Sequence, residues 1–419
     1  MFKNKKDDKM KISSVFTILL SLIICSTSYA ADSIQEAFTQ GSLKAELRTF
    51  YFTRDFDESD TREDFATGTL FYYKTAPLHG LSAGLSFATS NKVTDNDDND
   101  VYGLLAKSDS GQHKNYSKFQ EYYLQGDWFD TKIKYGAQEL YTPFANIHDI
   151  RMTPKTFRGL SVVNNSIKGL TLSGYYLNGY RGWADEEFTD MTSSAGAAEG
   201  DDSGLFIGGI GYDLPLEYAK TNAQIWQYHL DDVVNMTYAK MSISKKIGDF
   251  QLSFNPMYLH QNSSGSEYAG DIDSVQYGFN TGVAAYGVNL TLYHARTRDG
   301  NVFAPWGDEK VIVQQILASD RKDEDAYAYK LGYNFKALGV EGLDAYIFQS
   351  FYDTPDSGSS ASSDITETDF SVQYSFSEKS SLKGLSLRAR YAIVDEDTAE
   401  DFNDFRFYLR YQFAFGGKQ

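Results

Sequence analysis

Six arginines near the two ends of the chain are the residues best suited to recognise a ligand: Arg48, Arg54, Arg388, Arg390, Arg406 and Arg410. A guanidinium group stays charged at any physiological pH and presents a planar fork of N–H donors, which can bind both oxygens of a carboxylate at once. If the fold brings the six together, they form a row of fixed positive charges. Such a row predicts a path for solutes that carry a carboxylate.

The residues around these arginines alternate in a way that predicts β-strands with one apolar and one polar face. In the segment 405–415, apolar side chains, most of them aromatic, occupy every second position, and Arg406 and Arg410 lie between them. The same alternation runs through 43–54 and 385–391 and puts all six arginines on polar faces, because successive residues of a strand point to opposite sides. Lipid outside a barrel and water inside it explain both faces.

Counting such segments between residues 41 and 415 predicts an all-β chain, a closed antiparallel transmembrane barrel of about eighteen strands. An even number lets the first and last strands pair, so that no sheet edge faces lipid. Since adjacent strands lie about 4.8 Å apart, the six arginines are expected to share one wall. A plainer interpretation stays open, in which they only pair with neighbouring acids such as Glu46.

The links between the predicted strands are short on one rim and long and acidic on the other. Short links end in a Gly-Leu pair at residues 80, 169, 342 and 384, where glycine supplies the positive φ of a tight turn. In outer-membrane barrels the short turns are periplasmic and the long loops extracellular. One very short outer link is expected near residue 231, and the long ones cover 55–64, 89–116, 141–156, 180–203, 262–273, 298–323, 353–366 and 395–403.

The third long link, 141–156, has fewer acids than its neighbours and carries apolar residues that open water would not favour. We therefore expect it to fold inward and to narrow the channel. His148, Asp149 and Arg151 would then lie at the constriction, where fixed charges set selectivity. An ordinary external loop is the alternative.

The N-terminus predicts export. Residues 1–30 combine five lysines, an apolar run from Ile12 to Ile24 and a small-residue end at Ala30, which is typical of a removed signal peptide. The barrel domain is then 31–419. Cys25 is the only cysteine, so the mature chain is expected to hold no disulfide. No later segment is apolar for long enough to form a transmembrane helix, so entry into a membrane requires strands.

Three segments resemble the OprD-type family of outer-membrane porins. The stretch from Asn146 to Gly159 is similar to the family's constricting third loop. Residues 47–55 resemble its first strand, and Pro305-Trp306-Gly307 resembles a motif of its seventh loop. The likeness covers the whole mature chain.

The resemblance implies an eighteen-stranded porin with a narrow eyelet and a ladder of basic residues, which admits amino acids, small carboxylates, peptides or, in some members, oligosaccharides. By position, the six arginines fall where ladder residues are expected. The sequence departs from the family's pattern in two places: residues 416–419 follow the last aromatic residue of the final strand, and His148 precedes Asp149 in the eyelet. The family's substrate preferences are therefore not carried over.

The predicted function is passive diffusion of small polar solutes through the outer membrane of a Gram-negative bacterium, with lipid and lipopolysaccharide as the surroundings. No catalytic residues, metal site or cofactor are expected, because the six histidines are scattered and no Gly-x-Ser-x-Gly elbow is present. A net charge of −18 argues against a nucleic-acid partner. An adhesin or structural barrel that acts through its acidic loops is the alternative function. Monomer and homotrimer both stay open.

Overall fold

A computed structural model describes residues 31–94, 102–197 and 202–415. The predicted signal peptide, residues 1–30, and the C-terminal residues 416–419 lie outside the described residues. Among those described, no helix has the length and apolar character to cross a membrane.

The chain forms one closed antiparallel barrel of 18 strands, as the alternation predicted. Each strand pairs with its neighbours in sequence. The strands are β1 (Ser42–Phe56), β2 (Arg62–Lys74), β3 (Leu81–Thr94), β6 (Tyr116–Trp128), β7 (Thr131–Gln138), β8 (Thr156–Asn164), β9 (Leu170–Arg181), β10 (Leu205–Leu214), β11 (Lys220–Leu230), β12 (Val234–Ile247), β13 (Phe250–Ser263), β14 (Asp273–Ala285), β15 (Val288–Arg298), β16 (Asp325–Asn334), β17 (Leu343–Asp353), β18 (Ile365–Ser375), β19 (Leu385–Glu396) and β20 (Phe402–Phe415).

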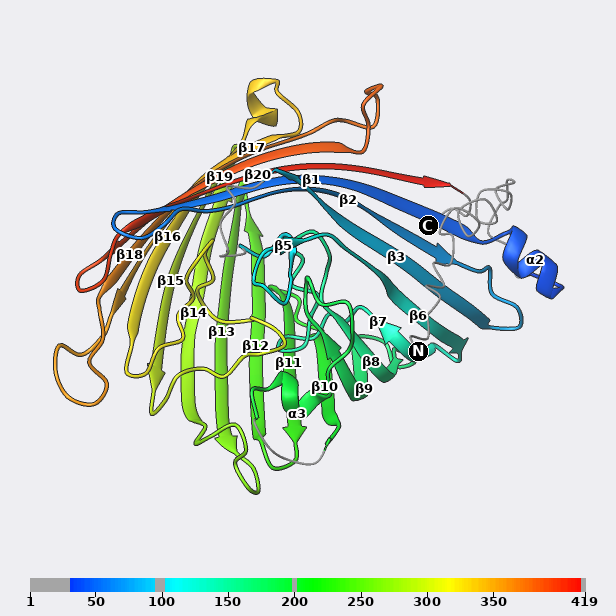
Figure 1. The fold of residues 1–419 in the computed structure, drawn as a ribbon, viewed down its shortest axis with the longest axis horizontal. Helices are drawn as coiled ribbons and strands as arrows, with labels where there is room; N and C mark the ends of the chain where they lie inside the picture. The colour runs from blue at the N-terminus through cyan, green and yellow to red at the C-terminus, as the bar shows by residue number, and fades with distance from the viewer. Residues whose placement is uncertain (1–30, 95–101, 198–201, 416–419) are drawn as a thin grey trace, which may run out of the picture.

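The barrel closes where β1 meets β20. The register runs from Leu43 opposite Phe415 to Phe56 opposite Phe402, and Figure 1 shows the blue first strand beside the red last one. This pairing removes both free edges, because every backbone group of a spanning strand needs a partner where lipid offers none.

The outer face of the barrel is apolar. Leu81, Leu124 and Tyr135 are 54%, 65% and 65% exposed, and each alternates with residues that face inward. Alternating exposed apolar side chains on a closed sheet are the pattern of a lipid-facing surface.

The rims also follow the prediction. Gly384 precedes β19 with φ +85°, and a Cβ there would lie 2.0 Å from the carbonyl oxygen of Gln412, so only glycine fits this turn. A very short outer link separates Leu230 from Val234. The remaining elements are small: α2 (Ile34–Thr39), β4 (Ala106–Lys107), β5 (His113–Lys114), α3 (Met191–Ser194) and the 3₁₀ helix η1 (Phe335–Leu338).

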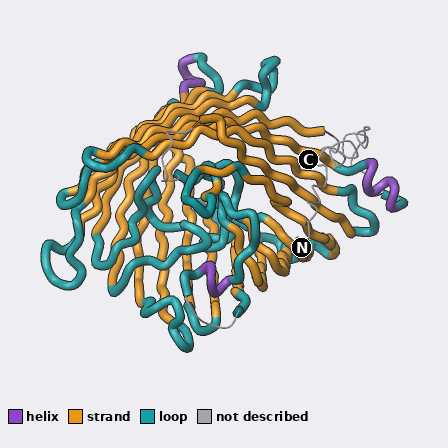
Figure 2. The backbone as a smooth tube through the Cα atoms, viewed as in Figure 1, coloured by secondary structure: helices purple, strands orange, loops and turns teal. Residues whose placement is uncertain are grey.

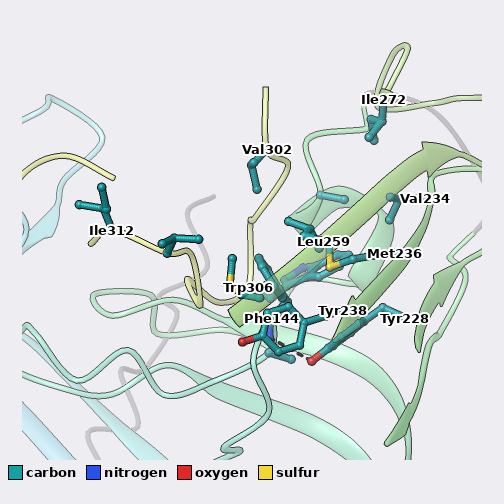
Figure 3. Close-up of a cluster of buried hydrophobic side chains, with 14 of the residues drawn as sticks. Phe144, Tyr228, Val234, Met236, Tyr238, Leu259, Ile272, Val302, Trp306 and Ile312 are labelled. Carbon is teal, nitrogen blue, oxygen red and sulfur yellow. Dashed lines mark hydrogen bonds between the residues drawn. The ribbon is translucent and has the colours of Figure 1, made fainter. Parts of the chain in front are cut away.

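Several long loops lie inside the barrel rather than above it, as Figure 2 shows by the loop segments gathered between the strands. We call the described residues 102–115 the second loop, 139–155 the third, 182–197 together with 202–204 the fourth, and 299–324 the seventh. Side chains of the third, fourth and seventh loops pack against β10 to β13 in an apolar cluster that includes Phe144, Trp306, Tyr228 and Tyr238 (Figure 3). A second, smaller apolar cluster, which includes Phe50, Phe52 and Tyr408, packs the second and third loops against β1 and β20.

Candidate functional site

The third loop is tied to the seam of the barrel by one carboxylate. Asp149 receives two bonds from the Arg48 guanidinium, at 2.6 and 2.9 Å, and a third from Arg410 at 3.1 Å. Arg48 stands on β1 and Arg410 on β20, opposite each other in register. The inward position predicted for this loop is therefore what the structure shows, and Asp149 lies in the lumen between two arginines.

The other two residues predicted for the constriction are held by aromatic rings. Trp183 of the fourth loop donates its indole N–H to the carbonyl oxygen of His148 at 2.7 Å, and the two rings meet edge to face. Burial lowers the pKa of His148 to about 4, so the imidazole is neutral at pH 7. The Arg151 guanidinium lies against the rings of Phe52, Tyr102 and Trp183 at 5.4, 5.8 and 5.1 Å.

The six predicted arginines share one wall, on β1, β19 and β20, and all point inward. Five of them contact a carboxylate. The structure shows these contacts: Arg48 and Arg410 bind Asp149, Arg54 and Arg406 bind Asp404, and Arg390 binds Asp369.

Arg388 differs from the other five. Its guanidinium donates to the Ser371 hydroxyl and the Tyr346 hydroxyl, both at 3.1 Å. The plainer interpretation, in which the arginines pair with acids, thus describes most of this wall within the described residues. Guidance of a solute carboxylate by the six arginines stays a prediction.

The seventh loop was expected among the external acidic links, and this was wrong for its middle part. The backbone N–H of Gln315 donates to Asp369 at 3.0 Å, and those of Ile316 and Leu317 donate to Glu367 at 2.9 and 2.8 Å. Three N–H groups held by two carboxylates of β18 bring the loop inside the lumen. The loop carries apolar residues at 311–313 and 316–317, the same kind of signal that predicted an inward position for the third loop.

The second loop adds a further contact that the sequence did not reveal. The Tyr102 hydroxyl bonds to the Asp404 carboxylate and accepts from Arg54 and Arg406 at 3.3 and 3.0 Å. Part of the predicted ladder therefore serves to hold a loop.

Below the third loop, toward the short turns, lies a cavity of about 410 Å³ with charges of both signs. Glu139 there accepts from the Tyr72 and Tyr141 hydroxyls at 2.9 and 3.3 Å, and its own backbone N–H donates to Glu121. Burial and the charge of Glu121 raise the pKa of Glu139 to about 8.

We expect the ion selectivity of the channel to change between pH 7 and pH 9. Glu139 gains a negative charge as the pH rises past its pKa of about 8. Burial lowers the pKa of Lys155 to about 8, so this ammonium loses its positive charge over the same range. Both changes favour cations. The reversal potential in a potassium chloride gradient should shift toward that of potassium as the pH rises in the native protein, and this shift should be smaller in E139Q and in K155M. A shift as large in both variants as in the native protein would contradict this assignment.

A family model described as outer membrane porin, OprD family, matches residues 36–415. The chain belongs to the OprD family of outer membrane porins. It is therefore a porin of the outer membrane of a Gram-negative bacterium. No curated protein matches it in sequence.

Solved structures of OprD-type porins share this fold. OpdK of Pseudomonas aeruginosa, crystallised with vanillate, is 21% identical with a TM-score of 0.79, covering 90% of this chain and 99% of that one. OccK9 (OpdG) of the same organism is 22% identical with a TM-score of 0.81, covering 89% and 98%. OccAB3 of Acinetobacter baumannii is 19% identical with a TM-score of 0.82, covering 90% and 99%.

Within the described residues, no group of three or more His, Cys, Asp or Glu side chains could hold a metal ion. The members of this family are channels, and the charged side chains described above contact loops and strands inside a barrel.

Proposed function

We propose that this OprD-family porin is a moderately selective channel through which small carboxylates, amino acids and short peptides diffuse passively. The observation that supports the proposal is the bridge from Arg48 through Asp149 to Arg410, which holds the third loop against the wall of arginines. A solute that passes this point meets fixed charges of both signs. A zwitterion can satisfy both, because its carboxylate faces arginine while its ammonium faces the acids.

The test is single-channel recording of the refolded mature protein in a planar bilayer. We expect discrete conductance steps and a selectivity that weakens as salt rises, because salt screens fixed charges over about 10 Å at 0.1 M. Liposome swelling with glycine and with glycerol then compares a zwitterion with a neutral solute, and glycine should enter faster than its size alone allows. A correctly folded barrel that shows no steps would contradict the proposal and leave the adhesin as the remaining candidate.

A further inference from the structure

A shallow groove of about 520 Å³ crosses the outer face of the barrel over β19, β20, β1, β2 and β3, which lie side by side in Figure 1. Its lining is apolar toward β19 and polar toward β3. The apolar members are Leu47, Leu382, Leu385, Leu409 and Tyr411, and the polar members are Thr49, Thr67, Thr69, Thr89 and Asn91.

The groove also climbs through the membrane. Leu385 is the first residue of β19 after a short turn, whereas Asn91 lies close to Thr94, where β3 ends at a long loop. This rise follows from the tilt of barrel strands, which is about 35–45°. The apolar end therefore lies nearer the periplasm and the polar end nearer the outer surface. A lipid in the outer leaflet has its chains and its headgroup in the same orientation.

The polar end of the groove lies inside the apolar band of the barrel. On β1, β2 and β3 the outward residues on both sides of it are apolar or aromatic, namely Leu47 and Tyr51, Phe65 and Phe71, and Phe87 and Val93. The rings of Tyr51 and Phe65 meet edge to face at 5.8 Å on its extracellular side, as in the aromatic belt at a membrane interface. The polar side chains thus lie just below the headgroups, where lipid surrounds them.

Most polar groups of the groove bond to one another, but one oxygen does not. The Thr49 and Thr67 hydroxyls lie 3.2 Å apart, and the Asn91 amide nitrogen donates to the Thr67 backbone carbonyl at 3.4 Å. Because that carbonyl can only accept, the amide presents its nitrogen there and its oxygen elsewhere. Within the described residues no donor bonds to this oxygen, although Asn91 is exposed on the outer face. Hydrocarbon leaves such a carbonyl unpaired unless the lipid itself carries a donor.

A second amide on the outer face shows how the barrel satisfies such a group by itself. Gln349 of β17 also lies between outward apolar residues, Ile347 and Phe351. Its amide oxygen accepts from the Tyr329 hydroxyl at 2.6 Å, and its nitrogen donates to the Thr368 hydroxyl at 3.1 Å. Both ends of this amide are therefore paired within the protein, in contrast to Asn91.

We propose that the groove binds one molecule of lipid A, the lipid anchor of lipopolysaccharide, with a hydroxylated acyl chain along its length. Lipid A carries hydroxyl and amide N–H groups on its acyl chains just below the sugars, so it brings donors to the depth of Asn91. A phospholipid offers only ester carbonyls at that depth, which accept but do not donate. The apolar end, from Leu47 to Leu382, receives the rest of the chain. The site lies on the outer surface and does not depend on what passes through the channel.

The first test needs only the wild-type mature protein. Native mass spectrometry of the refolded protein, released from detergent micelles, compares binding of lipid A and of dimyristoyl phosphatidylglycerol at equal concentrations. We expect one lipid A molecule to remain bound under conditions that release the phospholipid. β-Hydroxymyristate should displace lipid A at a lower concentration than myristate, because the two acids differ only in the hydroxyl donor. Equal binding of the two lipids, or equal displacement by the two acids, would overturn the proposal.

The second test replaces the amide. N91L is expected to weaken lipid A binding about five- to tenfold, the contribution of one hydrogen bond, and to leave phospholipid binding unchanged. The matched control is Q349L, which removes an outward amide whose partners lie within the barrel, so it should bind lipid A as the wild type does.

Three outcomes of the second test would contradict the site. No loss in N91L, or an equal loss in Q349L, would mean that the groove does not recognise the lipid. A dimer of the wild type that N91L dissociates would make a second copy of the chain the occupant instead of lipid A. Heat-modifiable migration on gels shows that each variant has folded.

Discussion

Replacing Asp149 with asparagine is expected to raise the single-channel conductance and to move selectivity toward anions. Arg48 and Arg410 face each other across the β1–β20 seam and share this one carboxylate. An amide offers one oxygen and no charge, so it cannot hold both guanidinium groups. The two cations then repel each other, and the third loop loses its strongest link to the wall.

The same substitution should lower the free energy of unfolding. The Arg48 side chain is only 2% exposed, and removing one partner of a buried ion pair costs about 3–5 kcal/mol. Arg48 keeps its contact with Glu46 at 2.6 Å, so we expect a loss of about 3 kcal/mol. Urea unfolding in lipid vesicles measures the loss, and planar-bilayer recording measures the conductance.

The control for Asp149→Asn is E341Q, in a turn on the opposite rim. Glu341 pairs with Lys336, and their side chains are 65% and 70% exposed. An exposed pair contributes about 0–1 kcal/mol, so this variant removes the same charge with little effect on stability or conductance. If Asp149→Asn behaves like E341Q, the carboxylate does not hold the loop.

The barrel could be predicted from the sequence because its rules are local. Alternation of apolar and polar residues sets which side each strand residue faces, and glycine marks the tight turns. On β1, β19 and β20, the series of alternate residues that begins with Leu43, Leu385 and Phe405 faces lipid. The residues between them therefore face the lumen. Closure then brings distant ends of the chain together without any further information.

The contacts inside the barrel could not be predicted in the same way. Nothing local to Asp404 indicates that it binds Arg54 as well as Arg406, and nothing near Glu367 indicates that it receives the seventh loop. These contacts depend on how loops from different strands fill one shared space.

Replacing Trp306 with alanine is expected to loosen the loops inside the barrel more than any other single change in the seventh loop. The indole is fully buried and donates its N–H to the Ser194 hydroxyl at 2.8 Å. The backbone carbonyl of Trp306 accepts a hydrogen bond from the backbone N–H of Asn146 at 3.2 Å. This one residue therefore joins the seventh loop to the fourth and the third, at the cluster drawn in Figure 3.

Truncating a buried tryptophan to alanine costs about 3–5 kcal/mol, since the cavity it leaves adds to the lost burial. The hydrogen bonds of the barrel stay in place, so the loss should appear in the loops before the strands unfold. We expect larger current noise and brief excursions to higher conductance, because the third loop moves when its packing partner is gone. A larger residue at the neighbouring Gly307 could not fill the space left by the indole, because a Cβ there would lie 2.6 Å from the Phe144 backbone.

Trp128→Ala is the matched comparison for Trp306→Ala, since it removes the same side chain from the rim of short turns. Trp128 is 41% exposed and donates to the His79 carbonyl at 2.9 Å, in the turn between β2 and β3. Its removal should leave the current quiet, so noise specific to Trp306→Ala assigns the effect to the loop cluster. Equal noise in the two variants would mean that the barrel itself, rather than the packing of its inner loops, sets the width of the channel.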